Sequence, residues 1–472
     1  MLNIFWWKRV MSDDLRRSDP IILPAEVRER LLATILQRLP RKSFGYLVSR
    51  SEPRRVDDFI LLEGNIRNTE EWKGRFEAYG QYFMEHDDAG FVSTPEETWR
   101  VQKEIWKRGM TEVGLFHSHL RHPANFSGID YDMHISRYPH LWHMIISVRN
   151  RTMPQVRIFN ISSDGVREEK IAEGGVTSSI ADPAEHSIDA AIAKARSFFA
   201  LDGQGLPCLH NAEAIVRAIE LLRKLNDPNI IDELVTRGLL AGSEKRLQQH
   251  ILPLMKPLEG GLFQMGTATD RRRHFVGETP CRTIALSPFS ITSVTVTNAL
   301  FGLLDRRRLR FLKEDLLKPA VNVSWYEATL FALWVGCRLP MESEWEFACG
   351  AGSDGEWACK EEADLRRIAW YADNSRGIIR QPGQLESNSY GLHDMHGNVW
   401  EWCKDTYDQA SYVQGGTIDP VHLRIIPTDK VCRGGSVDSL AEMCRTRYRI
   451  CEPPGFFASD LGFRLARSRP LH

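Results

Sequence analysis

Two histidines, a serine and an aspartate between positions 117 and 130 are the residues whose types and spacing most clearly predict chemistry. His117 and His119 are one residue apart, so on an extended segment their side chains point to the same side. Asp130 follows His119 by eleven residues, and a turn of the chain can bring it back as a third ligand. This set predicts a zinc site with one open position, where water becomes hydroxide near neutral pH and attacks a carbonyl. Ser127 is placed to hydrogen-bond the oxyanion as it forms.

The elements that must hold these residues alternate between strand and helix. Residues 113–117 are predicted as a strand that leads into the first histidine, and residues 142–148 as a second strand rich in Ile. The other predicted elements are helices at 26–39 and 95–108 and strands at 44–48 and 59–62. This alternation predicts an α/β or α+β layer structure.

The pattern His-x-His, seven residues, Ser, two residues, Asp resembles the signature of the JAMM (MPN, Mov34/PAD-1) metallopeptidase family. The resemblance extends over residues 24–161 and includes the early strand Phe44-Gly-Tyr-Leu47 and Asn65 after the second strand. Members of the family hydrolyse peptide or isopeptide bonds beside ubiquitin or ubiquitin-like proteins, or release small sulfur-carrier proteins. The resemblance implies that the two histidines and the aspartate bind zinc and that the serine stabilises the oxyanion.

The family's general base is replaced in this chain. The family places a glutamate three residues before the glycine of the early strand, and here that residue is Lys42. A charged lysine cannot accept a proton from water, and a metal ion repels it. Three explanations stay open: another carboxylate such as Glu63 substitutes, a partner supplies the base, or the domain binds its target without cutting. His122 is close in sequence, but we expect it to be a solvent-facing loop residue.

The segment from Gly260 onward is rich in Gly, Trp and Cys and predicts a loop-rich domain. Its motifs include Val323-Ser-Trp-Tyr-Glu327, Arg338-Leu-Pro340, Asp394-Met-His-Gly-Asn-Val-Trp-Glu401, Arg433-Gly-Gly-Ser436 and Gly462-Phe-Arg464. In this order they resemble the formylglycine-generating-enzyme-like domain, also called the sulfatase-modifying-factor domain. The resemblance covers residues 258–468 and implies a C-type-lectin-like fold with little regular secondary structure.

One of these motifs predicts a calcium site. Asp394 and Glu401 offer hard oxygen ligands within eight residues, which suits calcium. The resemblance implies a structural calcium held by the side chains of these two residues and by the backbone oxygens of Gly397 and Val399. A plain turn with solvated carboxylates is the alternative.

Copper chemistry is not expected in this domain. Catalytic members of the family bind copper through two cysteines five residues apart and oxidise a substrate cysteine. The corresponding positions here are Ser439 and Cys444, and Cys451 lies outside the family position, so a two-sulfur copper site is not supported. We therefore predict a recognition or scaffolding module, with an oxidase that uses Cys444 as the alternative.

Length and composition bound the remaining possibilities. A chain of 472 residues predicts more than one domain. The 61 basic and 62 acidic residues give a net charge of -1, so neither nucleic acid nor an anionic membrane is an expected partner. The nine cysteines are odd in number, which argues against a secreted disulfide framework and predicts a cytoplasmic protein. No apolar run reaches the roughly 18 residues needed to span a bilayer.

The predicted architecture is multidomain α+β. A loose N-terminus (1–19) precedes a JAMM-type α/β domain (20–170), a helical spacer (184–256) and the formylglycine-generating-enzyme-like domain (258–468). The leading functional prediction is a zinc hydrolase that cuts an amide or isopeptide bond after a ubiquitin-like tail and recognises its target through the last domain. A non-catalytic scaffold built from two degraded enzyme domains is the first alternative. By analogy with bacterial proteins of these families, partners from a defence or protein-conjugation system are expected.

Overall fold

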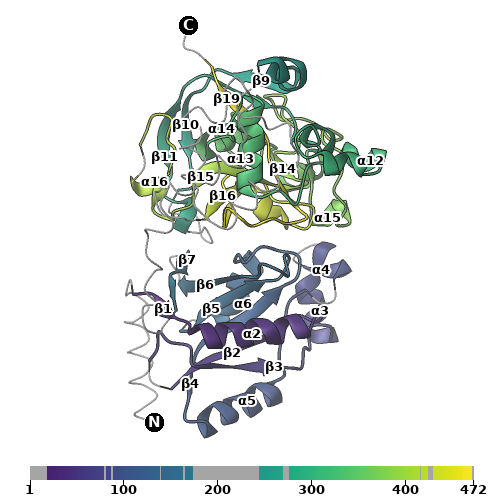
Figure 1. Ribbon diagram of the computed structural model, residues 1–472. Coiled ribbons are helices and arrows are strands. Elements are labelled where there is room, and N and C mark those ends of the chain that lie inside the picture. Colours follow the sequence, from purple (N-terminus) through teal and green to yellow (C-terminus); the bar gives the residue numbers. More distant parts are fainter. Residues whose placement is uncertain are drawn as a thin grey trace, which may run out of the picture. The chain divides into compact units, whose positions relative to one another are not determined.

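The computed structural model of the protein describes residues 19–50, 52–78, 81–86, 89–138, 140–162, 165–173, 244–268, 276–414, 416–423 and 429–469. These residues form two compact units, an N-terminal one up to residue 173 and a C-terminal one from residue 244 (Figure 1). The predicted loose N-terminus, apart from Asp19, and residues 184–243 of the predicted helical spacer lie outside the described residues. Within the described ranges, no helix is both long enough and apolar enough to cross a membrane.

A six-stranded sheet is the frame of the N-terminal unit. In spatial order its strands are β3 (Asp58–Leu62), β2 (Phe44–Ser49), β4 (Thr111–His119), β5 (Trp142–Ser147), β6 (Gln155–Ser162) and β7 (Gly165–Glu169). Strands β4 and β5 pair in parallel, and the other neighbours pair antiparallel. The connection from β4 to β5 contains α6 (Gly128–Arg137), because a parallel pair needs a crossover rather than a tight turn. The predicted strands are therefore confirmed, and one crossover spans the whole predicted zinc motif.

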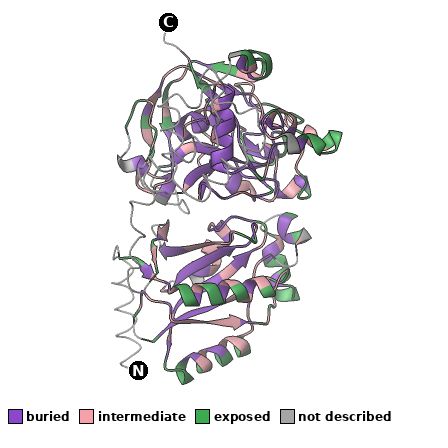
Figure 2. Cartoon of the chain, in the orientation of Figure 1, coloured by how far each residue is buried: buried purple, intermediate pink, exposed green. Residues whose placement is uncertain are grey.

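Two amphipathic helices also belong to this unit. Helix α2 (Ala25–Gln37) buries Val27, Leu31 and Ile35, which recur every four residues, and it ends shortly before Pro40. Helix α5 (Pro95–Lys107) is capped by Thr94, whose side chain accepts a hydrogen bond from the backbone N–H of Glu97. The strands are largely buried, whereas these helices keep an exposed face (Figure 2). The remaining elements are α3 (Glu70–Glu77), α4 (Gln81–Glu85) and the short parallel pair β1 (Ile21–Ile22) and β8 (Ile171–Ala172).

Two glycines allow the strands beside the histidines to pack closely. A Cβ atom at Gly45 would lie 2.2 Å from the carbonyl oxygen of Ile60 and 2.7 Å from the ring of Phe116. A Cβ atom at Gly114 would lie 2.5 Å from the ring of Trp142. Because real Cβ atoms do not approach other atoms so closely, glycine is required at both positions. The glycine in the early strand of the sequence motif therefore serves packing.

The C-terminal unit is built from many short elements, which confirms the prediction of a loop-rich segment. Its largest sheet contains β17 (Arg449–Glu452), β16 (Lys430–Arg433), β15 (Trp400–Thr406) and β18 (Leu461–Gly462). The other strands are β19 (Ala466–Ser468), β12 (Phe289–Thr292) and β9 (Met255–Leu258) in one sheet, and the pairs β10 (Gly261–Met265) with β11 (Arg282–Leu286) and β13 (Ala369–Trp370) with β14 (His396–Gly397). The helices are α10 (Glu244–Arg246), α11 (Asn298–Phe301), α12 (Lys313–Leu316), α13 (Trp325–Trp334), α14 (Glu342–Gly350), α15 (Ala372–Ser375) and α16 (Ser411–Gln414), with a π-helical turn at Leu247–Ile251.

Charged residues of three of the sequence motifs form ion pairs in the core of this unit, with one another or with glutamates of α14. Arg464 donates to both carboxylate oxygens of Glu401, at 2.6 and 2.7 Å. Arg433 reaches Glu342 at 2.9 Å and Glu346 at 2.5 Å. All five side chains are almost fully buried, and buried charges are tolerated only when they are paired and hydrogen-bonded. The motifs thus supply the polar framework that holds the loops together.

Candidate metal centre

The ends of one strand and one helix position the three predicted ligands. His117 and His119 occupy the C-terminal end of β4, and Asp130 lies in the first turn of α6. Ser127 is the N-cap of α6: its hydroxyl oxygen accepts the backbone N–H of Asp130 at 3.2 Å, and the Asp130 carboxylate accepts the backbone N–H of Ser127 at 3.0 Å. This reciprocal capping box fixes where the helix begins. The same short sequence therefore starts the helix and places the aspartate.

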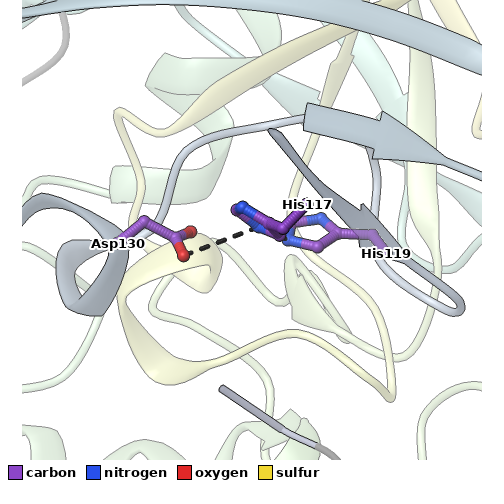
Figure 3. Close-up of side chains that lie close together, drawn as sticks. All are labelled: His117, His119 and Asp130. Atoms are coloured by element: carbon purple, nitrogen blue, oxygen red, sulfur yellow. Dashed lines mark hydrogen bonds and ion pairs between the residues drawn. The ribbon is translucent and has the colours of Figure 1, made fainter. Parts of the chain in front are cut away.

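The three side chains converge on one point (Figure 3). One potential ligand atom from each residue lies within 4.8 Å of the other two. The Nε2 atoms of His117 and His119 are 2.8 Å apart, and Nε2 of His117 is 3.6 Å from Oδ1 of Asp130. The His-x-His spacing on a strand therefore has the predicted effect, and the structure brings together all three residues named from the sequence.

A hydrogen bond on the far side of the His119 ring leaves the other nitrogen of this ring directed at the same point. Nδ1 of His119 lies 2.7 Å from the carbonyl oxygen of Pro123. A carbonyl can only accept, so Nδ1 carries the proton and the neutral ring keeps its lone pair on Nε2. Burial lowers the pKa of both His117 and His119, which favours the neutral, metal-binding imidazole. Two nitrogen lone pairs and a carboxylate oxygen facing one another fit a divalent cation such as zinc.

Only one oxygen of the Asp130 carboxylate is used by the helix cap, so the other can face the histidines. Its Oδ2 accepts both the backbone N–H of Ser127 and the Ser127 hydroxyl, the latter at 2.5 Å. Its Oδ1 is the atom that faces His117. In this arrangement the hydroxyl proton of Ser127 points to Asp130, so the role of Ser127 at an oxyanion stays a prediction.

Lys42 lies beside the centre. Residue 42 directly precedes Ser43, which exchanges hydrogen bonds with Ser118 at 2.8 and 2.9 Å, between the two histidines of β4. Burial is the main cause that lowers the pKa of His117 and of His119, and the positive charge of Lys42 lowers both further. The positive charge of Lys42 therefore acts on the two rings that could hold a metal.

Glu63, the predicted substitute base, forms ion pairs with two arginines. Its carboxylate accepts from Arg38 at 2.7 and 3.0 Å, and Arg41 lies 3.6 Å away. The hydrogen bonds from Arg38 hold the pKa of Glu63 below its ordinary value. Because a carboxylate with a lowered pKa is a weaker proton acceptor, this pairing disfavours Glu63 as a base. Its catalytic role stays a prediction.

Sequence reasoning missed two histidines and misplaced a third. His143 on β5 and His134 on α6 are buried and form hydrogen bonds that connect to His117. His122 is not solvent-facing: it is 8% exposed, and its Nε2 lies 2.8 Å from the hydroxyl of Tyr82. The sequence holds one signal for these residues, namely the clustering of histidines: six of the fifteen fall between positions 117 and 143.

The predicted calcium ligands of the C-terminal unit are buried, at 3% exposure for Asp394 and 1% for Glu401. The alternative of solvated carboxylates is therefore wrong. Glu401 is already paired with Arg464 and accepts the indole N–H of Trp345 at 2.8 Å. Oδ2 of Asp394 accepts the backbone N–H of Gly383 at 2.7 Å, whereas the buried Oδ1 has no hydrogen-bond partner among the described residues. That open oxygen fits a cation, and calcium ligation with Gly397 and Val399 stays a prediction.

The positions that would bind copper are also buried. The hydroxyl oxygen of Ser439 accepts the backbone N–H of Ser436 at 2.8 Å. Burial raises the pKa of the Cys444 thiol well above its ordinary value. Since the thiolate is the metal-binding form of cysteine, this environment disfavours metal binding by Cys444.

Comparison with known proteins assigns each unit to a family. Residues 24–161 match the family of prokaryotic homologs of the JAB domain, and residues 242–469 match the sulfatase-modifying factor enzyme 1-like domain. The chain is 30% identical over 272 residues to the serine/threonine-protein kinase pkn1 of Chlamydia caviae, a match that covers 50% of this chain and 42% of that protein. The chain thus spans less than half the length of this relative.

Two further relatives are named for formylglycine generation. The formylglycine-generating enzyme of Streptomyces coelicolor is 29% identical, with 45% of this chain and 89% of that protein covered. The inactive C-alpha-formylglycine-generating enzyme 2 of Bos taurus is 27% identical, with 49% and 94% covered. The similarity therefore includes both an enzyme and a protein described as inactive.

Proposed function

We propose that this chain, in which a prokaryotic JAB (JAMM/MPN) domain is joined to a formylglycine-generating-enzyme-like domain, is a zinc-dependent hydrolase of an amide or isopeptide bond. The observation that carries the proposal is the convergence of His117, His119 and Asp130 within 4.8 Å. The match of residues 24–161 to the JAB family supports it independently.

The residues of the centre have distinct tasks in this reaction. His117 and His119 would hold the metal through Nε2, and Asp130 would hold it through Oδ1. When bound, a divalent metal ion supplies Lewis acidity, which lowers the pKa of water and polarises a carbonyl. Pro123 keeps the His119 ring in the required tautomer through its carbonyl oxygen. Ser127 turns its hydroxyl from Asp130 to the carbonyl oxygen of the substrate, where negative charge develops.

The substrate and partners belong to the proposal as well. The scissile bond is the amide or isopeptide bond that follows a ubiquitin-like tail, and the C-terminal unit, with a C-type-lectin-like fold, recognises the protein target. Partner proteins come from a bacterial defence or conjugation system, and one of them is the source of the missing base. The engagement of Glu63 by two arginines supports a base from outside the domain.

A second candidate is a protein that binds its target without cutting it. Lys42 favours this candidate, because its ammonium group stands where the family has the general base and cannot accept a proton from water. In that case the JAB domain keeps its ligand set as a binding or structural feature.

Elemental analysis with a cleavage assay separates the candidates. We expect about one zinc per chain in the wild type and in His250→Ala, which changes an exposed histidine of the other unit, but none in His119→Ala. Wild-type protein that folds without binding zinc would contradict the proposal. Cleavage of ubiquitin-like fusions by the zinc-loaded protein would establish the hydrolase, whereas zinc without cleavage would favour the binding protein.

A further inference from the structure

A row of three histidines, in which His134 and His143 are buried and His117 is partly exposed, leads from the proposed metal centre into the core. Nδ1 of His117 lies 2.7 Å from Nε2 of His143, and Nδ1 of His143 lies 3.1 Å from Nδ1 of His134. Nε2 of His134 lies 2.8 Å from the carbonyl oxygen of Leu141, where the row ends. The ring centroids are 4.8 and 5.2 Å apart. Every nitrogen of His134 and His143 therefore has a partner within hydrogen-bond distance.

The carbonyl at the end of the row sets the direction of every hydrogen bond in it. Since the oxygen of Leu141 can only accept, Nε2 of His134 carries the proton, and the neutral ring accepts at Nδ1. Nδ1 of His143 must then donate, which leaves the lone pair of His143 on Nε2. That nitrogen in turn accepts from Nδ1 of His117. The lone pair of His117 is thereby left on Nε2, the atom that faces His119 and Asp130.

Three elements of the crossover contribute to the row. His117 lies on β4, and His143 lies on the parallel neighbour β5. His134 follows Asp130 by four residues on α6, so the helix presents a proposed metal ligand and the last histidine of the row on one face. The ring of Phe126 packs against both His134 and His143, with centroids 6.4 and 5.3 Å away. The geometry of the row is thus held by packing as well as by hydrogen bonds.

We propose that His143 and His134 are positioning residues that fix the tautomer and the ring orientation of His117, so that its Nε2 lone pair points at the metal. This inference rests on the proposed metal centre, and neither residue touches the metal or the substrate. Groups that hydrogen-bond the far nitrogen of a ligating histidine typically contribute about 10- to 100-fold to metal affinity. The row replaces the single carboxylate or carbonyl that usually plays this part.

The tautomers can be read directly in the unaltered protein. Nitrogen chemical shifts of full-length protein labelled with ¹⁵N in its histidines should show a proton on Nδ1 and none on Nε2 of His143, with the reverse pattern for His134. The measurement is made with and without zinc. A proton on Nε2 of His143 would overturn the inference, because that nitrogen could then not accept from His117.

Substitution of His143 tests the consequence for the metal. His143→Phe should weaken zinc binding about 10- to 100-fold in competition with a chelator and should change the visible spectrum of bound Co²⁺. His143→Gln should restore binding to within a few-fold of the wild type, since its amide oxygen can accept from His117. The control His86→Phe changes a half-buried histidine of the same unit that is not part of the row and should bind zinc like the wild type.

The outcomes separate this inference from the proposed function. Wild-type binding by His143→Phe, or binding by His143→Gln as weak as that of His143→Phe, would overturn the positioning role while the metal centre stands. A wild-type chain that binds no zinc would instead contradict the metal centre, and the tautomers of His143 and His134 would then decide alone whether the row exists.

Discussion

The two oxygens of the Asp130 carboxylate have different partners: Oδ2 accepts a hydrogen bond from the Ser127 hydroxyl at 2.5 Å, and Oδ1 faces His117. The helix cap therefore orients the proposed metal ligand. A carboxylate held in this way cannot rotate without giving up the hydrogen bonds that begin α6.

This relationship predicts that Ser127→Ala affects both stability and the site. Loss of the cap should lower the free energy of unfolding by about 1 kcal/mol, and loss of the hydroxyl should reduce hydrolysis by a larger factor than the loss of metal affinity explains. Thr94→Ala removes a similar N-cap on α5 and is the matched control. It should cost similar stability and leave zinc affinity and hydrolysis unchanged. Equal effects of the two substitutions on hydrolysis would refute the role of Ser127.

The charge of Lys42 should oppose metal binding. Lys42→Met should raise zinc affinity by up to about tenfold at low salt, because a cation near the site is removed. Lys103→Met, on the exposed face of α5, is the control and should have no effect on affinity. Isothermal titration with a competing chelator measures the difference. Unchanged affinity in Lys42→Met would show that the charge of Lys42 does not reach the metal.

Restoration of the family glutamate tests the chemistry. If a base is what the domain lacks, Lys42→Glu should accelerate hydrolysis of a ubiquitin-like fusion by about 100- to 10,000-fold, the usual contribution of general acid–base catalysis. The comparison with Lys42→Met separates the gain of a base from the loss of a charge. A rate no higher than that of Lys42→Met would mean that another group already supplies the base or that the site does not cut.

The C-terminal unit should lose stability in mild acid. Burial lowers the pKa of His396 to about 4, so this ring stays neutral in the folded state while the unfolded chain takes up a proton below about pH 6.5. Stability therefore falls as the pH drops from about 6.5 towards 4. Urea unfolding at several pH values should show a shallower fall in His396→Gln than in the wild type. His250→Gln, at an exposed position, should keep the wild-type profile.

Calcium should act on the same unit through Asp394. If its open Oδ1 binds the ion, EGTA should lower the midpoint of thermal unfolding in the wild type and should have no effect in Asp394→Asn. Glu401→Gln is a poor test, because it breaks the buried pair with Arg464 and should cost about 3 to 5 kcal/mol with or without calcium. An EGTA effect that persists in Asp394→Asn would exclude this site.

The three proposed ligands could be predicted from the sequence because local rules place them. The period of two along a strand puts His117 and His119 on one side, and the Ser127 cap puts Asp130 in the first turn of a helix. His134 and His143 could not be recognised in this way. Their relation to His117 depends on the pairing of β4 with β5 and on the packing of α6, which no local spacing reveals.

The same limit explains the other differences between prediction and structure. A carboxylate such as Glu63 looks available in a sequence, and its arginine partners emerge only when the strands and α2 have packed. Likewise, His122 follows a strand end and resembles a loop residue, but Tyr82, forty residues earlier, covers it. Partners that are distant in the chain decide whether a polar side chain is free to act.

The placement of the whole centre in one β4–α6–β5 crossover has a consequence for how the protein is made. The ligands and the row of histidines span only residues 117 to 143, so the loop that must close to assemble them is short and its closure costs little chain entropy. Contacts between residues this close in sequence form early in folding. We therefore expect that a chain emerging from the ribosome can bring the residues of the proposed metal centre together once β5 has emerged, before most of the C-terminal unit is made.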